Sequence, residues 1–133
     1  AVSEVLRQGL SVVLFPEGTT SDGETVRPFK SALLTAAIDT GTNLLPVCLR
    51  YTRVDRRSID RHTRDTVFYH GGTGFFEHAP RLLALKSVSV ELLLQRPLSL
   101  HRHRTRKELA ARAHEVISAA YHRRPHGQRA GQR

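Results

Sequence analysis

The chain has 133 residues, which suits one domain of ordinary size, and its apolar content of 39% permits a modest hydrophobic core. A single cysteine, Cys48, excludes a disulfide framework within the chain and fits a reducing compartment. No apolar run approaches the ~18 residues that span a bilayer, and no signal peptide is visible.

The positive charge is concentrated in the second part of the chain. The net charge is +9, yet residues 1–50 carry only four basic side chains against five acidic ones. Residues 51–133 therefore hold the whole basic excess, together with all eight histidines. A face this basic favours polyanions, either an anionic lipid surface or nucleic acid. Genome composition is an alternative explanation, because arginine outnumbers lysine eighteen to three.

The first predicted elements are a short helix and a buried strand. Residues 2–8 place apolar side chains on one helical face, and Gly9 follows as a stop signal. The apolar run from Leu10 to Phe15 predicts a short strand inside a parallel sheet. Pro16 ends that strand because it has no N–H to donate to a ladder.

The turn after this strand is the candidate binding site. Glu17 lies at the carboxyl end of the predicted strand, where ligands bind in open α/β sheets. Gly18 can adopt a positive φ and lets another group approach the backbone closely. The hydroxyls of Thr19, Thr20 and Ser21, with free backbone N–H groups, suit an anionic or polar headgroup. On spacing alone, an ordinary turn is the more frequent outcome of such a cluster.

A helix and a second strand are predicted next. Pro28 suits a first helical position, and Gly41 ends the helix. Arg27 and Lys30 bracket the helix start, where they either attract an anion or are ordinary solvated charges. Residues 43–51 predict a second strand, so that strand, helix and strand form a parallel unit with a right-handed crossover.

The middle of the chain has weaker signals. The charged residues 52–65 predict an exposed loop, residues 66–69 a short strand, and residues 75–85 a helix in their second half. Alternation across residues 87–95 predicts a half-buried strand near the sheet edge, whose apolar face holds Val88, Val90, Leu92 and Leu94.

The last predicted element is a helix. Thr105 and Glu108 have the spacing of a capping box, and an apolar stripe continues to Tyr121. From about Arg123 the composition turns to Arg, Gly, Gln, His and Pro, which predicts disorder.

Three motifs carry a family resemblance. Phe15–Ser21 reads Phe-Pro-Glu-Gly-Thr-Thr-Ser, Pro28–Ala32 reads Pro-Phe-Lys-Ser-Ala, and Leu45–Val47 reads Leu-Pro-Val. In order and spacing these motifs resemble the blocks of the glycerolipid acyltransferases, the lysophosphatidic-acid acyltransferase-like family. The resemblance is specific over residues 9–51 and weaker over residues 66–121.

The resemblance implies an α/β fold with a mainly parallel sheet and flanking helices. Residues 1–122 would form the carboxy-terminal part of a lipid acyltransferase domain, and residues 123–133 a disordered basic tail. The family's catalytic His-x-x-x-x-Asp is absent, because no histidine is followed by aspartate five residues on. Since only 14 residues precede Phe15, we expect the amino-terminal part of the domain to be missing. We therefore assign no catalytic residue to this chain and predict that it has no turnover alone.

The activity implied by the resemblance is acyl transfer to the hydroxyl of a lysophospholipid or lyso-ornithine lipid. Acyl-CoA or acyl-carrier protein would be the co-substrate, with no further cofactor and no metal. The expected location is the cytoplasmic face of the membrane, either peripheral or anchored through the missing amino-terminal segment. The residues that match the acceptor-binding part are Glu17, Gly18, Thr19, Thr20, Ser21, Arg27 and Lys30.

One departure from the family pattern concerns the acceptor. The family often has arginine where this chain has Thr20, and a threonine cannot clamp a phosphate in a bidentate way. The longer string from Glu17 to Gly23 is similar to the lyso-ornithine-lipid acyltransferase branch, whose acceptor is an aminolipid.

The sequence bears on two other functions. Ser21 as a nucleophile is disfavoured, because no Gly-x-Ser-x-Gly elbow and no assignable base accompany it. A basic nucleic-acid-binding module is the alternative, but no nucleic-acid motif is present and nucleic acid is not the expected partner. An anionic membrane surface is expected instead, with His101–Lys107 and the arginines between Arg53 and Arg64 as candidate contacts, unless these are simply solvated.

Overall fold

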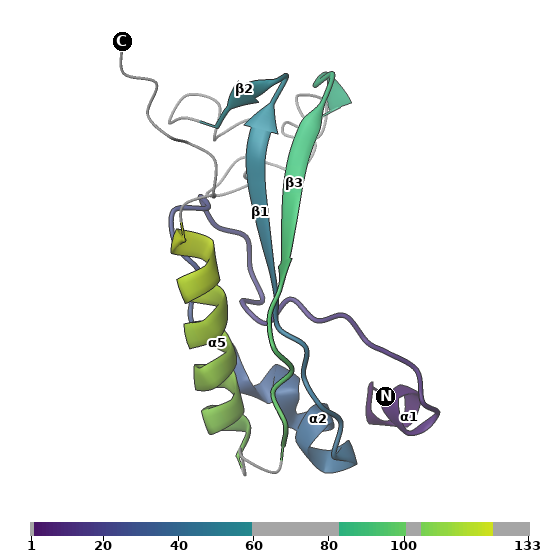
Figure 1. Cartoon of the computed structure of the whole chain (residues 1–133). Helices are drawn as coiled ribbons and strands as arrows, with labels where there is room; N and C mark the ends of the chain where they lie inside the picture. Colours follow the sequence, from purple (N-terminus) through teal and green to yellow (C-terminus); the bar gives the residue numbers. More distant parts are fainter. Residues whose placement is uncertain (1, 60–82, 101–104, 124–133) are drawn as a thin grey trace.

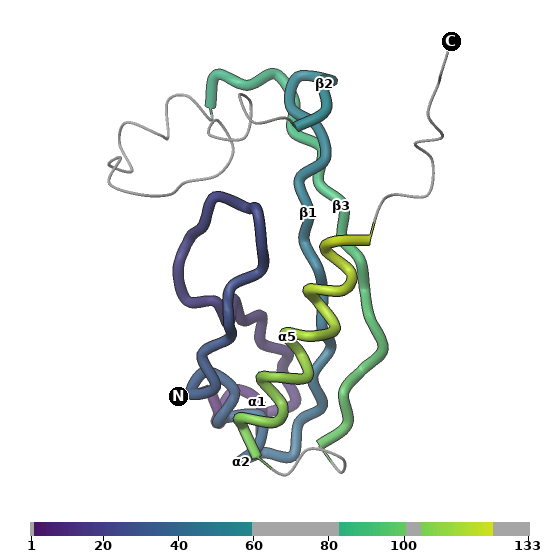
Figure 2. Tube along the Cα trace, turned by 90° about the vertical axis from the view of Figure 1, so that its left-hand side faces the viewer, coloured from purple at the N-terminus to yellow at the C-terminus, as the bar shows by residue number. Residues whose placement is uncertain are grey.

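The computed structural model describes residues 2–59, 83–100 and 105–123 (Figure 1). In chain order the elements are α1 (Val2–Arg7), a 3-10 helix η1 (Ser31–Leu34), α2 (Thr35–Thr40), β1 (Val47–Val54), β2 (Arg57–Ser58), β3 (Val88–Leu94) and α5 (Arg106–His122). Helix α5 lies along the β1–β3 pair, and α1 lies on the other side of the molecule, against α2 (Figures 1 and 2).

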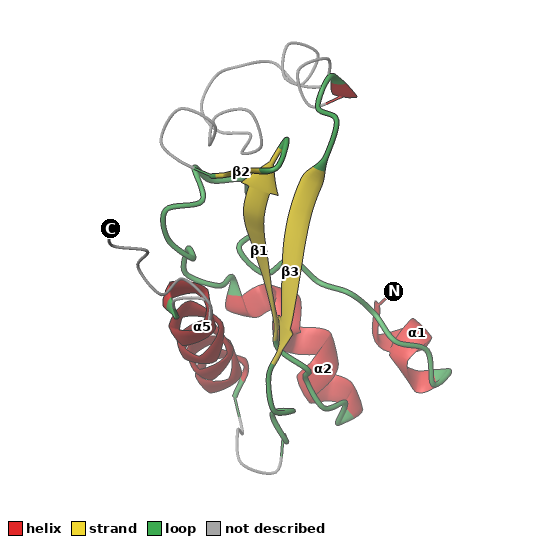
Figure 3. Cartoon of the chain, turned by 45° about the horizontal axis from the view of Figure 1, so that its top comes forward, coloured by secondary structure: helices red, strands yellow, loops and turns green. Residues whose placement is uncertain are grey.

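Among the described residues the sheet has three strands, in the order β2-β1-β3 (Figure 3). Both pairings are antiparallel, and β1 aligns Val47 with Leu94 and Val54 with Val88. The fold class is therefore mixed α/β, as predicted, but the expected mainly parallel sheet is not found in the described residues. Strand β3 lies at the sheet edge, as its alternation predicted.

The sheet differs from the predicted parallel one because the predicted first strand, residues 10–15, does not form. Residues 10–15 form no strand, although their apolar character is that of one. Two of their large side chains are exposed, since Val13 is 81% exposed and Phe15 is 75% exposed, whereas Leu14 between them is partly buried. Apolar character predicts that a segment seeks burial, but it does not say which strand edge accepts it. The predicted parallel strand–helix–strand unit is accordingly absent from the described part of the chain.

The two faces of the β1–β3 pair are covered differently. The partners Cys48 and Leu93 lie on the face toward α5, and Cys48 is only 1% exposed. The opposite face carries apolar side chains that remain exposed: Val47, Leu49, Val90, Leu92 and Leu94. We call this set the open face. The prediction that the Val90–Leu94 side of β3 is buried was wrong, because alternation gives the period of a strand and not the side that a helix covers.

The buried core joins α5 to the first part of the chain. Leu34 and Ala37 pack with Leu109 and Ala110 of α5, and the partly buried Leu14 and Phe29 contact this cluster. The predicted helix from Pro28 begins later, at Ser31, and its first turn is a 3-10 helix. Its end at Gly41 is as predicted, since Gly41 has φ 67° and its N–H bonds to the last carbonyls.

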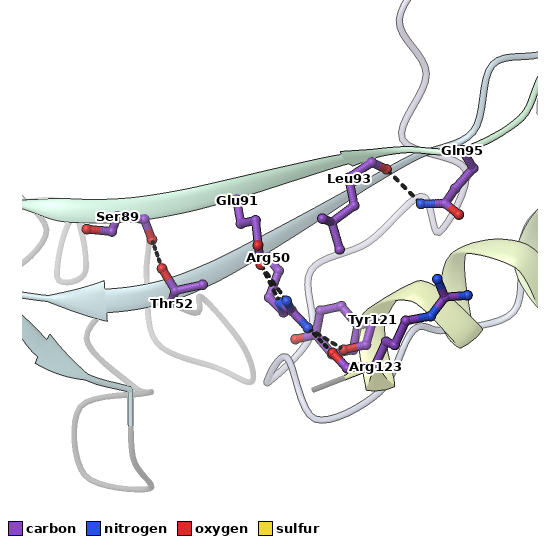
Figure 4. A network of polar contacts seen from close by, with 8 residues as sticks. All are labelled: Arg50, Thr52, Ser89, Glu91, Leu93, Gln95, Tyr121 and Arg123. Carbon is purple, nitrogen blue, oxygen red and sulfur yellow. Dashed lines mark hydrogen bonds and ion pairs between the residues drawn. The ribbon is translucent and has the colours of Figure 1, made fainter. Parts of the chain in front are cut away.

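Helix α5 begins at the predicted capping box. The Thr105 side chain accepts a hydrogen bond from the Glu108 backbone, and the Glu108 side chain accepts one from the Thr105 backbone. Its other end is anchored by Arg50 of β1, which donates to the carbonyl oxygens of Tyr121 and Arg123 and pairs with Glu91 of β3 (Figure 4). The last carbonyls of a helix have no partner within it, so Arg50 supplies one here.

Residues 52–59 are not the exposed loop that was predicted. They complete β1, make a turn, and return as β2, with Arg53 opposite Ser58 and Val54 opposite Arg57. The two turn residues, Asp55 and Arg56, have φ of 48° and 67°, as a two-residue hairpin turn with two positive φ angles requires. The expected strand at 66–69, most of the expected helix at 75–85, residues 101–104 of the basic segment and the expected disordered tail beyond Arg123 lie outside the described residues.

Candidate functional site

The motif Phe15–Ser21 opens a loop that closes again at Lys30, and we call residues 16–30 the 16–30 loop. Figure 2 shows it standing beside β1 and α5. At its neck the Lys30 N–H donates to the Pro16 carbonyl over 2.8 Å, and the Gly18 N–H donates to the Phe15 carbonyl over 3.1 Å. The first of these bonds joins the two ends of the loop before any side chain contributes, and the second closes the turn at its start.

Glu17 strengthens this neck. Its Oε2 accepts a hydrogen bond from the backbone N–H of Arg27 over 2.8 Å. A hydrogen bond to an ionised carboxylate is stronger than one between neutral groups, so Glu17 fixes the spacing between the two sides of the loop. Arg27 thus contacts Glu17 through its backbone N–H, and Arg27 itself is exposed to solvent.

Gly18 and Lys30 come together as a second pair. Gly18 has φ 63°, and the Lys30 ammonium donates to its carbonyl over 3.3 Å. A Cβ at Gly18 would lie 2.8–3.0 Å from the last carbons and the nitrogen of Lys30. The prediction that this glycine adopts a positive φ and admits a close neighbour is confirmed, and the neighbour is a cation.

The three hydroxyl residues lie beyond this pair. Thr19 and Thr20 are exposed, and the Thr19 hydroxyl is 3.4 Å from the Thr20 carbonyl. Ser21 is half-buried, and its Oγ accepts from the Gly23 N–H over 3.3 Å. Asp22 accepts from the backbone two residues on in the same way. The structure thus gathers Glu17, Gly18, Lys30 and the backbone of Arg27 at the neck, and it presents the two threonines to solvent.

Two residues of α5 contact this loop and were missed from the sequence. The Tyr121 hydroxyl donates to the Gly23 carbonyl, and His114 Nε2 lies 3.1 Å from the Val26 carbonyl. The His114 ring also meets Phe29 edge-on, with the ring centroids 5.3 Å apart. The available signal was their spacing, because His114 and Tyr121 lie two helical turns apart and so share one face of the predicted helix.

Cys48 is a core residue, as predicted. Burial raises the pKa of its thiol above the ordinary value, and the Glu91 carboxylate adds to this while Arg50 opposes it. A thiol held in its protonated form is a poor nucleophile, so Cys48 takes no part in the site. Over residues 2–59, 83–100 and 105–123, no cluster of metal-ligating side chains is assembled, and none of the helices there could cross a membrane.

The comparisons with known proteins agree with the motifs. Residues 1–50 match the protein family described as Acyltransferase. The lyso-ornithine lipid O-acyltransferase of Brucella abortus is 34% identical over 116 residues, which cover 82% of this chain and 43% of the relative. The protein of that name from Pseudomonas aeruginosa is 30% identical over 119 residues, covering 90% of this chain and 43% of the relative. No solved structure matches the chain.

A second group of relatives matches a shorter stretch of the chain. The 1-acyl-sn-glycerol-3-phosphate acyltransferase of Neisseria gonorrhoeae is 51% identical over 51 residues, which cover 38% of this chain and 20% of the relative. The relatives that match this chain are named as acyltransferases of lipid substrates, in agreement with the motifs of the 16–30 loop. The chain is similar to members of the lysophosphatidic-acid acyltransferase-like family and spans 43% of the length of the two lyso-ornithine relatives above.

Proposed function

We propose that this chain is the acceptor-binding part of a lysolipid O-acyltransferase. The observation that carries the proposal is the neck of the 16–30 loop. Gly18 and Lys30, which come from two motifs of the family resemblance, are joined there by a hydrogen bond, and Glu17 accepts another from the Arg27 backbone. A loop closed in this way holds exposed threonine hydroxyls in one place at low entropic cost.

The reaction that the complete enzyme would perform is acyl transfer from acyl-CoA or acyl-carrier protein. The lysolipid hydroxyl oxygen attacks the thioester carbonyl, the carbon–sulfur bond breaks, and the thiol leaves. A histidine base takes the hydroxyl proton, and a positioned base contributes about 10²–10⁴-fold in rate. In our proposal that base and its aspartate come from a segment outside these 133 residues. The chain alone then binds the acceptor without turning it over.

The mainly parallel sheet belongs to this complete enzyme. Val13 and Phe15 are apolar and exposed, which is the condition of a strand that lacks its neighbour. No helix of the described residues covers the open face of β1 and β3, whereas sheets of α/β proteins carry helices on both faces. We place residues 10–15 as a strand of that larger sheet, with the 16–30 loop at its carboxyl end.

The acceptor that this loop favours is a lyso-ornithine lipid. Thr20 has a hydroxyl where the family often has an arginine, whose guanidinium would bind a phosphate in a bidentate way. The loop therefore has less affinity for a phosphate-bearing headgroup. The two relatives that cover 82% and 90% of this chain are named for lyso-ornithine lipid, whereas the relative from Neisseria gonorrhoeae, named for acylglycerol phosphate, covers 38% of it. The Lys30 ammonium and exposed Arg27 remain available to a headgroup carboxylate.

Contact with an anionic membrane surface at its cytoplasmic face completes the proposal. Arg53, Arg56 and Arg57 are exposed at the β1–β2 hairpin, so they can approach a lipid surface without losing a buried partner. Each basic residue near such a surface is worth about 1 kcal/mol. Residues 101–107 would add to this attraction.

A chimera tests the function. The segment of the Brucella abortus relative that aligns with residues 9–51 is replaced by residues 9–51 of this chain, and acylation of lyso-ornithine lipid is measured. We expect the chimera to retain activity, and we expect Lys30→Gln within it to raise KM more than Ser31→Ala, the matched control beside it. Thr20→Arg should shift its preference toward lysophosphatidic acid.

The chain itself supplies the complementary result. Residues 1–133 incubated with acyl-CoA and lyso-ornithine lipid should give no product above a blank reaction. An active chain alone would contradict the division of labour proposed here. A chimera that folds but is inactive with every lysolipid would contradict the function.

A further inference from the structure

We propose that His114 and Tyr121 of α5 are positioning residues that hold the 16–30 loop in its binding conformation. The inference rests on the proposed function for what the loop binds. The positioning of the loop rests on contacts of His114 and Tyr121 that no sequence motif indicates. The proposal gives α5 a part in acceptor recognition, although α5 contributes no residue to the three motifs of the family resemblance.

The contacts are directed at two backbone carbonyls of the loop. Tyr121 donates its hydroxyl hydrogen to the Gly23 carbonyl. His114 Nε2 lies 3.1 Å from the Val26 carbonyl, and a carbonyl can only accept, so Nε2 carries the hydrogen. The Ser118 hydroxyl lies 3.3 Å from the same nitrogen. The three side chains occupy successive turns of one helix face.

The His114 ring is fixed from a second direction. Phe29, at the returning end of the loop, meets it at an interplanar angle of 87°, an edge-to-face geometry that aromatic pairs favour. The loop is therefore held at its neck by Glu17 and Lys30 and along its returning side by α5. Between these holds lie Gly18, Thr19 and Thr20, which are exposed.

Helix α5 is itself firmly placed. Leu109, Ala110 and Ala113 are buried, and Arg50 ties its last carbonyls to the sheet (Figure 4). A loop hydrogen-bonded to a packed helix loses less conformational freedom when a ligand binds than a free loop does. Removing the hold should therefore weaken acceptor binding and leave the fold of the helix in place.

The experiment compares four variants of the chain. Tyr121→Phe removes only the hydroxyl, and His114→Ala removes the ring nitrogen. His114→Gln keeps a side-chain N–H at a similar reach, and Glu115→Gln changes an exposed residue on the same helix as the control. Hydrogen exchange of the amides of residues 18–26 and of α5 is followed by NMR. Lyso-ornithine lipid below its micelle concentration is then titrated into each variant.

We expect amide exchange in residues 23–26 to accelerate about two- to tenfold in Tyr121→Phe and His114→Ala, the range for loss of one hydrogen bond. Exchange within α5 should be unchanged, and lysolipid affinity should fall by a similar factor. His114→Gln should restore most of both properties, which a purely structural defect would not allow. Glu115→Gln should match the unaltered chain.

Unchanged loop exchange in Tyr121→Phe and His114→Ala, with α5 still protected, would overturn the proposal. So would faster loop exchange without any loss of lysolipid affinity. If Tyr121→Phe unfolds α5, the comparison of His114→Gln with His114→Ala decides. If the unaltered chain does not respond to lysolipid but its loop exchange depends on Tyr121, the proposed function fails while the hold by α5 stands.

Discussion

Gly18 meets two constraints that no other residue type satisfies together. Its φ of 63° is a left-handed conformation, and its missing side chain leaves the space that Lys30 fills. The ammonium of Lys30 is thereby placed against the loop backbone, next to exposed hydroxyls. At the scale of single residues, the position of the Lys30 ammonium in the site depends on Gly18 having no Cβ.

Gly18→Ala tests that dependence, with Gly41→Ala as a matched control. Gly41 has nearly the same φ, 67°, but no atom lies within 4 Å of the Cβ position. Both substitutions should therefore cost about 1 kcal/mol in the free energy of unfolding, the usual penalty of a left-handed L-residue. Chemical denaturation measures this.

Only Gly18→Ala should also displace the Lys30 side chain, since the close atoms are the flexible end of that lysine. We therefore expect the lysolipid affinity to fall in Gly18→Ala and not in Gly41→Ala. Equal affinities in the two variants would show that the Lys30 ammonium has no role in binding.

Arg50 is the link between the sheet and the last helix. Its side chain is 13% exposed, it pairs with Glu91, and it donates to two carbonyls at the end of α5. At the scale of elements, this one guanidinium satisfies helix carbonyls and a strand carboxylate together. Its loss would leave both sets without their donor.

Arg50→Met should destabilise the chain by about 2 kcal/mol, because hydrogen bonds to a charged donor are lost at a mostly buried site. Arg53→Met is the matched control, since Arg53 lies on the same strand and is exposed. Thermal unfolding of both variants provides the measurement. A destabilisation of the same size in the two would contradict the anchoring role of Arg50.

Local signals predicted much of the molecule correctly. The capping box at Thr105, the stop at Gly41 and the edge strand at residues 88–94 all carry their information within a few residues. The bend after Phe15 and the positive φ of Gly18 were likewise set by local sequence.

Several of the errors share one physical cause, which is that the sequence of a segment does not identify its distant partners. The run at residues 10–15 is apolar whether or not another strand pairs with it. The alternation of apolar and polar side chains along β3 does not indicate which of its two faces α5 covers. The contacts of His114 and Tyr121 with the 16–30 loop join positions 88 and 98 residues apart, so the loop motif alone could not indicate them.

The open face has a consequence for handling this polypeptide. Leu92 is 59% exposed and Leu94 is 67% exposed, beside Val47 and Leu49 of the neighbouring strand. Contiguous apolar surface of this kind tends to bind other apolar surface. Purified alone, the chain should bind a fluorescent hydrophobic dye and sediment as oligomers, whereas the Leu92→Thr, Leu94→Thr double variant should do both less. A monomer that binds no dye would show that Leu92 and Leu94 are shielded in solution. If the chain does form oligomers, co-expression with a chaperone is the practical route to soluble material.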